Sequence, residues 1–185
     1  APAAVKEFGH GEKQVDLMRT ILLLLLLTAI AFAVGPVEER LAGLKVGADG
    51  DGQVVRQFGP GHLISKPWGG ERYYRNGDLY LFAAYATDKV LSEVTISRTP
   101  ILPPGRKDAL PAMQCPKVTE ALTTGKGIAL GATEAEVEKL YGKPSSRADG
   151  WNYKFLESRG GLPKFFRVWF KDGRAVKISI FMPAG

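Results

Sequence analysis

Residues suited to molecular recognition stand at alternating positions near the end of this 185-residue chain. From residue 165 to residue 171 every second residue is aromatic or basic, and a further lysine follows the Asp172-Gly173 turn. Exposed tryptophan and arginine contribute much of the binding energy at protein interfaces. We therefore expect a partner-binding surface made of Lys154, Phe165, Arg167, Trp169, Lys171 and Lys177, with Ser179 beside them. In the first half of the chain, the equivalent surface is expected to hold Tyr73, Arg75, Leu81, Tyr85 and Glu93.

These aromatic residues have a second interpretation, in which they pack between the two halves of the chain or under loops as ordinary core. Tyr85 and Trp169 are separated by 84 residues, the spacing at which the chain repeats, so we expect them at matching positions. Aromatic rings beside cations also suit sugars and single-stranded nucleic acids. The export signal described below argues against nucleic acid.

The sequence contains no residue pattern that predicts catalysis, a metal or a cofactor. His62 has no second histidine at helical spacing, which a zinc site of the common helical kind requires. Asp49-Gly50-Asp51-Gly52 resembles the start of a calcium loop but lacks its third carboxylate and its final glutamate. Cys115 lies in a proline-rich segment far along the chain from His62, so a thiol–imidazole pair is not expected. We therefore expect a non-enzymatic protein with no cofactor.

Two alternating segments are predicted to position the recognition residues on strands. Residues 176–180 alternate between apolar and polar side chains, and Phe166, Val168 and Phe170 alternate with the aromatic and basic residues. Asp172-Gly173 is a strong signal for a tight hairpin between the two segments. Because side chains alternate across a strand, the apolar set is expected to face the helices and the recognition set to face away.

The chain repeats its own pattern with an offset of 84 residues. Residues 44–48 return as residues 128–132 at this offset, with Gly47 corresponding to Gly131. Residues 54–60 return as residues 137–144, after a segment at 49–53 that is one residue longer than its counterpart. A supersecondary unit used twice explains this self-similarity. The expected organisation is a first repeat at 36–98, a Pro-rich linker at 99–115 and a second repeat at 116–182.

Each repeat is predicted to open with two helices. The first helices are expected at 37–41 and 117–122, each directly after a proline. The second helix of the later repeat begins at the capping box Thr133–Glu136 and ends at Gly142, whereas its counterpart ends at Gly59. Three or four antiparallel strands follow. The predicted fold class is α+β, with two tandem helix-helix-antiparallel-sheet repeats.

The N-terminal part has the pattern of a secretory signal peptide. Met18-Arg19 precedes residues 21–34, a run of 14 without a charge that includes six consecutive leucines, and Ala31-Phe32-Ala33 is a small-residue cleavage site. The run is short for a membrane span of roughly 20 residues; a retained anchor or a buried helix is the alternative. We expect a signal peptide at 18–33, a non-native or n-region extension at 1–17, and a periplasmic or secreted protein.

Charge points to anionic partners. The chain has 25 Lys and Arg residues against 19 Asp and Glu residues, a net charge of +6. A basic exported protein meets anionic lipids, wall polymers and acidic proteins; a basic surface kept for solubility is the alternative. The single cysteine, Cys115, cannot form an internal disulfide, which leaves pairing between chains or simple burial.

One motif carries a resemblance to a known family. Residues 127–137, Gly-Ile-Ala-Leu-Gly-Ala-Thr-Glu-Ala-Glu-Val, followed by Gly142 and Pro144, resemble the turn-and-helix motif of the beta-lactamase inhibitory protein superfamily. That superfamily includes small outer-membrane assembly lipoproteins. The resemblance implies an exported module that binds other proteins through a concave sheet. This chain lacks both the lipobox cysteine and the paired cysteines of some members.

The sequence therefore predicts an exported, non-enzymatic binding or scaffold module that recognises a protein partner of the cell envelope or the extracellular space. The alternative is an envelope protein that uses its basic residues to bind an anionic cell-wall polymer or a lipid surface. Neither reading includes nucleic acid or, after cleavage, a stable membrane span.

Overall fold

The structure is a computed structural model that describes residues 38–86, 89–101, 112–155 and 163–183. The chain divides after Pro36, and the fold described below belongs to the second unit, Val37–Gly185. The predicted extension at 1–17 and signal peptide at 18–33 lie outside the described residues. Within the described residues, no helix has the length and apolar character needed to cross a membrane.

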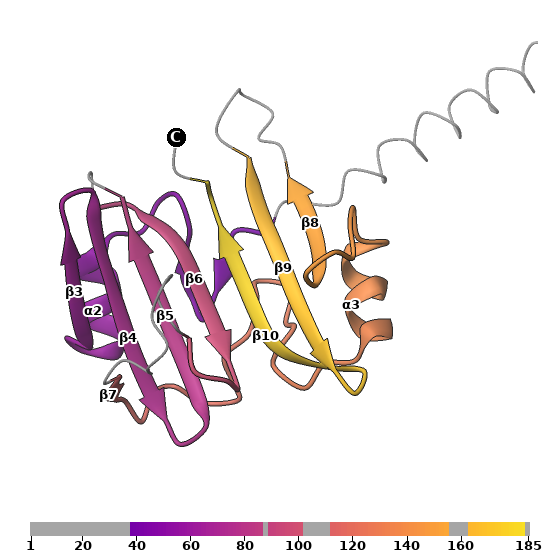
Figure 1. Ribbon diagram of the computed structural model, residues 1–185, viewed down its shortest axis with the longest axis horizontal. Coiled ribbons are helices and arrows are strands. Elements are labelled where there is room, and N and C mark those ends of the chain that lie inside the picture. Colours follow the sequence, from indigo (N-terminus) through magenta and orange to yellow (C-terminus); the bar gives the residue numbers. More distant parts are fainter. Residues whose placement is uncertain (1–37, 87–88, 102–111, 156–162, 184–185) are drawn as a thin grey trace, which may run out of the picture. The chain divides into compact units, whose positions relative to one another are not determined.

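One eight-stranded sheet runs through both halves of the sequence (Figure 1). Its strands follow the order β3-β4-β5-β6-β10-β9-β8, with every neighbouring pair antiparallel, and β7 runs parallel to β4. The strands are β3 (His62–Lys66), β4 (Gly69–Asn76), β5 (Leu79–Tyr85), β6 (Leu91–Ser97), β7 (Met113–Gln114), β8 (Trp151–Phe155), β9 (Lys164–Lys171) and β10 (Arg174–Phe181). β7 comes from the predicted linker at 99–115, of which residues 102–111 are outside the described part.

Two short helices, α2 (Asp51–Phe58) and α3 (Glu134–Tyr141), precede the antiparallel strands that their halves contribute to the large sheet. The predicted capping box is confirmed: the Thr133 hydroxyl accepts a bond of 3.3 Å from the Glu136 N–H, and the Glu136 carboxylate accepts one of 2.7 Å from the Thr133 N–H. α3 ends at Gly142 and α2 ends at Gly59, as expected from their glycines.

Neither predicted first helix is present in the described residues 38–41 and 117–122, which corrects the fold class. Residues 40–45 form a hairpin of β1 (Arg40–Leu41) and β2 (Leu44–Lys45), joined by two residues with φ of 55° and 78°. Residues 117–122 lie in turns and irregular backbone. Segments of five or six residues are too short to sustain a helix without strong packing. The described chain is mostly antiparallel sheet with two helices, so the prediction of two helix-helix-sheet repeats is wrong.

A single hydrophobic core fills the space between the helices and one face of the sheet. α2 contributes Val54 and Phe58, and α3 contributes Val137, all buried in the same cluster. The sheet contributes alternate residues of its central strands. These include Leu81 and Ala83 of β5, Val94 and Ile96 of β6, Phe166 and Val168 of β9, and Ile178 and Ile180 of β10. Both halves of the sequence therefore depend on one shared core.

The two halves meet where β6 pairs with β10 in the middle of the sheet. In this register Thr95 lies opposite Ser179, and Ile96 lies opposite Ile178. The hydroxyl oxygens of Thr95 and Ser179 lie 2.8 Å apart across this pair, and both side chains are buried. Thr95 and Ser179 are also 84 residues apart, the spacing at which the sequence repeats.

Candidate functional site

We call the side of the sheet that faces away from α2 and α3 the open face. In the second half it carries the odd-numbered residues of β9, the odd-numbered residues of β10 from Lys177 onward, and the even-numbered residues of β8. This follows from the register, because Phe166 and Val168 belong to the core and their neighbours must point the other way. Ala175 lies on the core side because the register of β10 shifts between Ala175 and Lys177. The structure therefore places on the open face Lys154, Phe165, Arg167, Trp169, Lys177 and Ser179, with Lys171 following the same phase at the end of β9.

The first half departs from the prediction, because Tyr85 and Leu81 lie in the core on the helix side. The cause is a difference of one residue between the β5–β6 hairpin and the β9–β10 hairpin. Phe82 pairs with Thr95, thirteen residues later, whereas Arg167 pairs with Ser179, twelve residues later. A shift of one residue moves every side chain to the opposite face. Tyr85 therefore does not match Trp169, and its predicted place on a binding surface is wrong.

Tyr73 is on the open face but is covered. It packs against Phe82 with ring centroids 5.0 Å apart, and Ile101 and Ala112 pack over the pair. Only 3% of Tyr73 is exposed. Glu93 of β6 lies on the same face, is partly buried, and accepts hydrogen bonds of 2.8 and 3.1 Å from the hydroxyls of Thr95 and Ser179.

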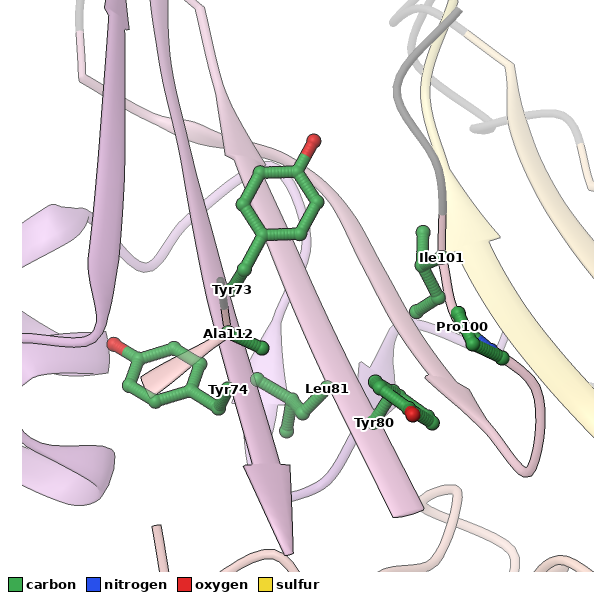
Figure 2. A pocket seen from close by; sticks show the side chains of 7 residues that line it. All are labelled: Tyr73, Tyr74, Tyr80, Leu81, Pro100, Ile101 and Ala112. Atoms are coloured by element: carbon green, nitrogen blue, oxygen red, sulfur yellow. The ribbon is translucent and has the colours of Figure 1, made fainter. Parts of the chain in front are cut away.

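A small cavity next to this covered region does not offer a substrate site. Figure 2 shows its lining, with the rings of Tyr73 and Tyr74 projecting from β4 in different directions and with Pro100 and Ile101 on the other side. Its volume is about 10 Å³. A cavity of that size holds at most about one water molecule.

Arg75, at the end of β4, is the one predicted first-half residue that is exposed.

The accessible recognition residues thus gather on β8, β9 and β10. We call this group the aromatic-basic patch and define it as Lys154, Phe165, Arg167, Trp169, Lys177 and Phe181. Phe165 and Phe181 stack with ring centroids 5.2 Å apart and an interplanar angle of 15°. The Arg167 guanidinium lies 5.2 Å from the centre of the Phe181 ring and 5.4 Å from that of Trp169. Such contacts hold rings and cations in fixed positions.

Trp169 is held from two sides while remaining partly exposed. The Lys177 ammonium lies 4.2 Å from the centre of its ring, and its Nε1–H donates a bond of 3.2 Å to an Asp149 carboxylate oxygen. Asp149 reaches the ring because Gly150, with φ of 94°, follows it. A Cβ at Gly150 would lie 2.9 Å from the Val168 carbonyl oxygen and 3.1 Å from the Trp169 ring. The glycine therefore permits the close approach that orients the tryptophan.

The charged side chains in and around the patch differ in whether they form ion pairs. Arg167 is paired with Asp149 at 3.3 Å and donates to the Asn152 side-chain oxygen. Lys154 and Lys171 are exposed, and neither forms an ion pair with a described residue. Because an exposed, unpaired ammonium keeps its charge available, these lysines give the rim of the patch a positive field.

The other candidate residues from the sequence contact neighbouring residues of the fold. The Asp49 carboxylate accepts a hydrogen bond of 2.7 Å from the Lys45 N–H, and Asp51 is paired with Arg72. The buried Cys115 thiol donates to the Phe58 carbonyl oxygen at 3.2 Å. His62 stands on β3 opposite Tyr73. No three His, Cys, Asp or Glu side chains gather as a metal site within the described ranges.

Sequence reasoning missed two features at the other end of the sheet. Trp68, in the turn between β3 and β4, is 67% exposed. Its neighbours Pro67 and Gly69 are turn residues, so a tryptophan at a loop tip could have been identified from the sequence. The second feature is a cavity beside α2 that involves Tyr85. No local pattern marks that cavity, because its walls come from separate strands.

Comparisons with known proteins give little further guidance. No protein-family model and no curated protein matches the sequence. Among solved structures, the chain is similar to one described as a DUF4309 family protein (YjgB) from Bacillus subtilis subsp. subtilis str. 168. The two chains are 14% identical, the similarity covers 76% of this chain and 83% of that chain, and the TM-score is 0.42. A similarity of this extent assigns no function.

Proposed function

We propose that this protein is an exported, non-enzymatic binding module that recognises an acidic segment of a protein partner with its aromatic-basic patch. The observation that supports it most directly is Trp169, a partly exposed ring fixed between Lys177 and Asp149. An anchor that is already oriented loses little conformational entropy on binding. Tryptophan and arginine at the centre of a patch are also the side chains that dominate interface energies.

The surrounding charges favour an acidic partner. Lys154 and Lys171 are exposed without an ion pair to a described residue, and Lys177 contacts the face of Trp169. Carboxylates on a partner would find these cations at the rim while an apolar side chain rests on Trp169 or Phe165. Complementary charge of this kind accelerates encounter and selects the partner. The resemblance of residues 127–144 to a superfamily of protein-binding modules supports the same choice of partner class.

The experiment compares two tryptophans. The full protein is immobilised and incubated with envelope, secreted and cytoplasmic fractions of its own cell, and retained proteins are quantified for the wild type, Trp169→Ala and Trp68→Ala. We expect an acidic protein from an extracytoplasmic fraction to bind the wild type and Trp68→Ala, and to be lost with Trp169→Ala. Truncating a central aromatic anchor typically weakens binding by at least about 2 kcal/mol, or roughly thirtyfold.

Two results would contradict the proposal. One is equal retention by Trp169→Ala and the wild type; the other is a partner found only in the cytoplasmic fraction.

The exposed lysines support a second candidate, adhesion to an anionic polymer or lipid. In that case Lys154→Gln with Lys171→Gln would abolish binding to phosphatidylglycerol vesicles, Trp169→Ala would not, and binding would fall steeply with salt.

A further inference from the structure

A cavity of about 270 Å³ opens beside the N-terminus of α2, on the helix side of the sheet and away from the aromatic-basic patch. Its walls come from the ends of β3, β4 and β5 and from the first residue of the helix. Its lining includes Asp51, Leu63, Ser65, Gly70, Tyr85 and Lys89. Small-molecule sites are typically concave, mostly apolar and provided with a few polar groups.

The hollow exists because a glycine occupies the middle strand. Ser65 of β3 pairs with Gly70 of β4, and Gly70 pairs with Tyr85 of β5, so the three residues form one row across the sheet. Gly70 has no side chain at the centre of the row, so Leu63 and Tyr85 approach this position, with Leu63 Cδ1 3.5 Å and Tyr85 Cδ2 4.0 Å from where a Cβ would stand. A Cβ at Gly70 would lie 3.5 Å from both Ile64 O and Leu63 Cδ1, an ordinary contact. A larger side chain there would therefore enter the cavity without a backbone clash.

The Tyr85 hydroxyl is a polar group without a partner. The residue is 6% exposed, and the hydroxyl has no hydrogen-bond partner among the described residues. Among charged groups, the Asp51 carboxylate acts on it most strongly. Burial, followed by that negative charge, raises the pKa of Tyr85, so the hydroxyl keeps its proton and can only gain by donating it to an acceptor. A buried donor left unsatisfied costs free energy.

The charges around the cavity favour an anion over a cation. Asp51 is already neutralised by Arg72, whose Nε and Nη2 donate bonds of 2.5 and 2.9 Å to the two carboxylate oxygens. The guanidinium holds the pKa of Asp51 below its usual range. Lys89 is exposed at the edge of the cavity and forms no ion pair with a described residue, whereas Lys66 is paired with Glu71. The positive end of the α2 dipole acts in the same direction.

We propose that this cavity binds a small organic carboxylate, with its negative group between Lys89 and the Tyr85 hydroxyl and its apolar body against Leu63. The volume admits a molecule of a few carbons or a single aromatic ring. The site is separate from the aromatic-basic patch, and its occupation does not depend on whether the patch binds protein.

Benzoate is the probe, and benzamide is its neutral counterpart of nearly equal shape. Amide NMR shifts of the ¹⁵N-labelled protein are followed as each is added, and dissociation constants are compared across variants. We expect saturable benzoate shifts around Ser65, Tyr85 and Lys89, and weaker binding of benzamide. Lys89→Gln should weaken benzoate about tenfold, the worth of one charge-assisted hydrogen bond, and leave benzamide unchanged. Lys154→Gln and Trp169→Ala are the matched controls and should bind benzoate like the wild type.

Two further variants separate a ligand site from a merely structural hollow. Gly70→Leu fills the space and should abolish the benzoate shifts, while Gly70→Ala should keep the fold and only weaken binding. Tyr85→Phe removes the unsatisfied hydroxyl, so the ligand-free protein should melt no lower than the wild type although benzoate binds less tightly. A variant that only damaged the fold would lower both the melting temperature of the ligand-free protein and the affinity for benzoate.

The proposal is overturned if benzoate produces no saturable shift up to its solubility limit, if benzylamine binds more tightly than benzoate, or if Gly70→Leu binds benzoate as the wild type does. Should Gly70→Leu fail to fold, Lys89→Gln and Tyr85→Phe decide, since neither changes the backbone. Loss of benzoate binding in Trp169→Ala would also contradict the separation of the two sites.

Discussion

Single residues in this protein take their roles from partners that are distant in the sequence. Glu38 falls in a segment that the sequence predicts as a helix, yet it is 3% exposed and connects three parts of the chain. Its carboxylate accepts bonds from the backbone N–H groups of Arg40, Gly125 and Lys126 at 3.0 to 3.2 Å. It also accepts a bond of 2.5 Å from the Tyr141 hydroxyl, whose pKa is raised by burial and by Glu38, so that it remains a donor.

The residue-scale prediction is that Glu38→Gln destabilises the protein by about 2–3 kcal/mol, because the new amide group replaces an acceptor with a donor that faces the four part-buried donors around it. Urea unfolding at pH 7 measures the effect. The control is Glu120→Gln, whose carboxylate is 63% exposed and pairs with Arg98; it should cost less than about 1 kcal/mol. Equal effects from the two substitutions would show that the Glu38 network contributes nothing beyond a surface ion pair.

The same scale explains which site residues could be predicted. Alternation between Phe165 and Lys171 is a local pattern, and it was enough to place Trp169 opposite the core. Tyr85 was misplaced because its face depends on the length of a hairpin, where one residue changes the phase. The cavity beside Tyr85 had no local signal, since Gly70 and Ser65 meet it only through strand pairing.

At the scale of elements, the two helices are attached to the rest of the protein by different means. α3 carries its own capping box, a signal confined to four residues, and it was predictable for that reason. α2 begins at Gly50 without a side-chain cap, and its first residue, Asp51, instead pairs with Arg72 of β4. The β1–β2 hairpin was missed because a proline before charged residues favours a helix start, whereas Leu41 and Leu44 are fully buried by tertiary packing.

At the scale of elements, we predict that the Asp51–Arg72 ion pair makes the stability of the protein fall in acid. Arg72 holds the pKa of Asp51 below its ordinary value of 3.8, so the unfolded chain takes up this proton at a higher pH than the folded chain does. The stabilisation is therefore complete above about pH 4 and is lost as the pH falls through the lowered pKa. We expect Asp51→Asn to be less stable than the wild type at pH 7 and to lose less stability between pH 5 and pH 2, as measured by urea midpoints.

Glu134→Gln is the matched control for this prediction. Glu134 is the first residue of α3, as Asp51 is of α2, but it is exposed and has no ion pair with a described residue. Its acid dependence should follow that of the wild type. A wild-type curve that runs parallel to that of Asp51→Asn below pH 5 would contradict the role assigned to the ion pair.

At the scale of the whole molecule, the pairing of β6 with β10 decides how the halves depend on each other. Repetition in the sequence indicated two similar halves but not the pairing, because pairing of distant strands leaves no local trace. The structure joins them in the middle of one sheet, with Ile96 opposite Ile178 and Thr95 opposite Ser179. α2 and α3 cover the same core from the two halves. Residues of both halves belong to one core cluster, so neither half forms a complete hydrophobic core without the other.

We therefore predict that the halves unfold together. Ile178→Ala removes fully buried methyl groups at the junction and should cost about 2–5 kcal/mol. Because the core is shared, hydrogen exchange should accelerate by the same factor at the amides of β5, in the first half, and β9, in the second. Leu140→Ala, at a side chain that is 43% exposed, is the control and should change exchange little in either strand. If Ile178→Ala accelerates exchange in β9 and leaves β5 protected, the two halves are separate cooperative units and the shared core does not couple them.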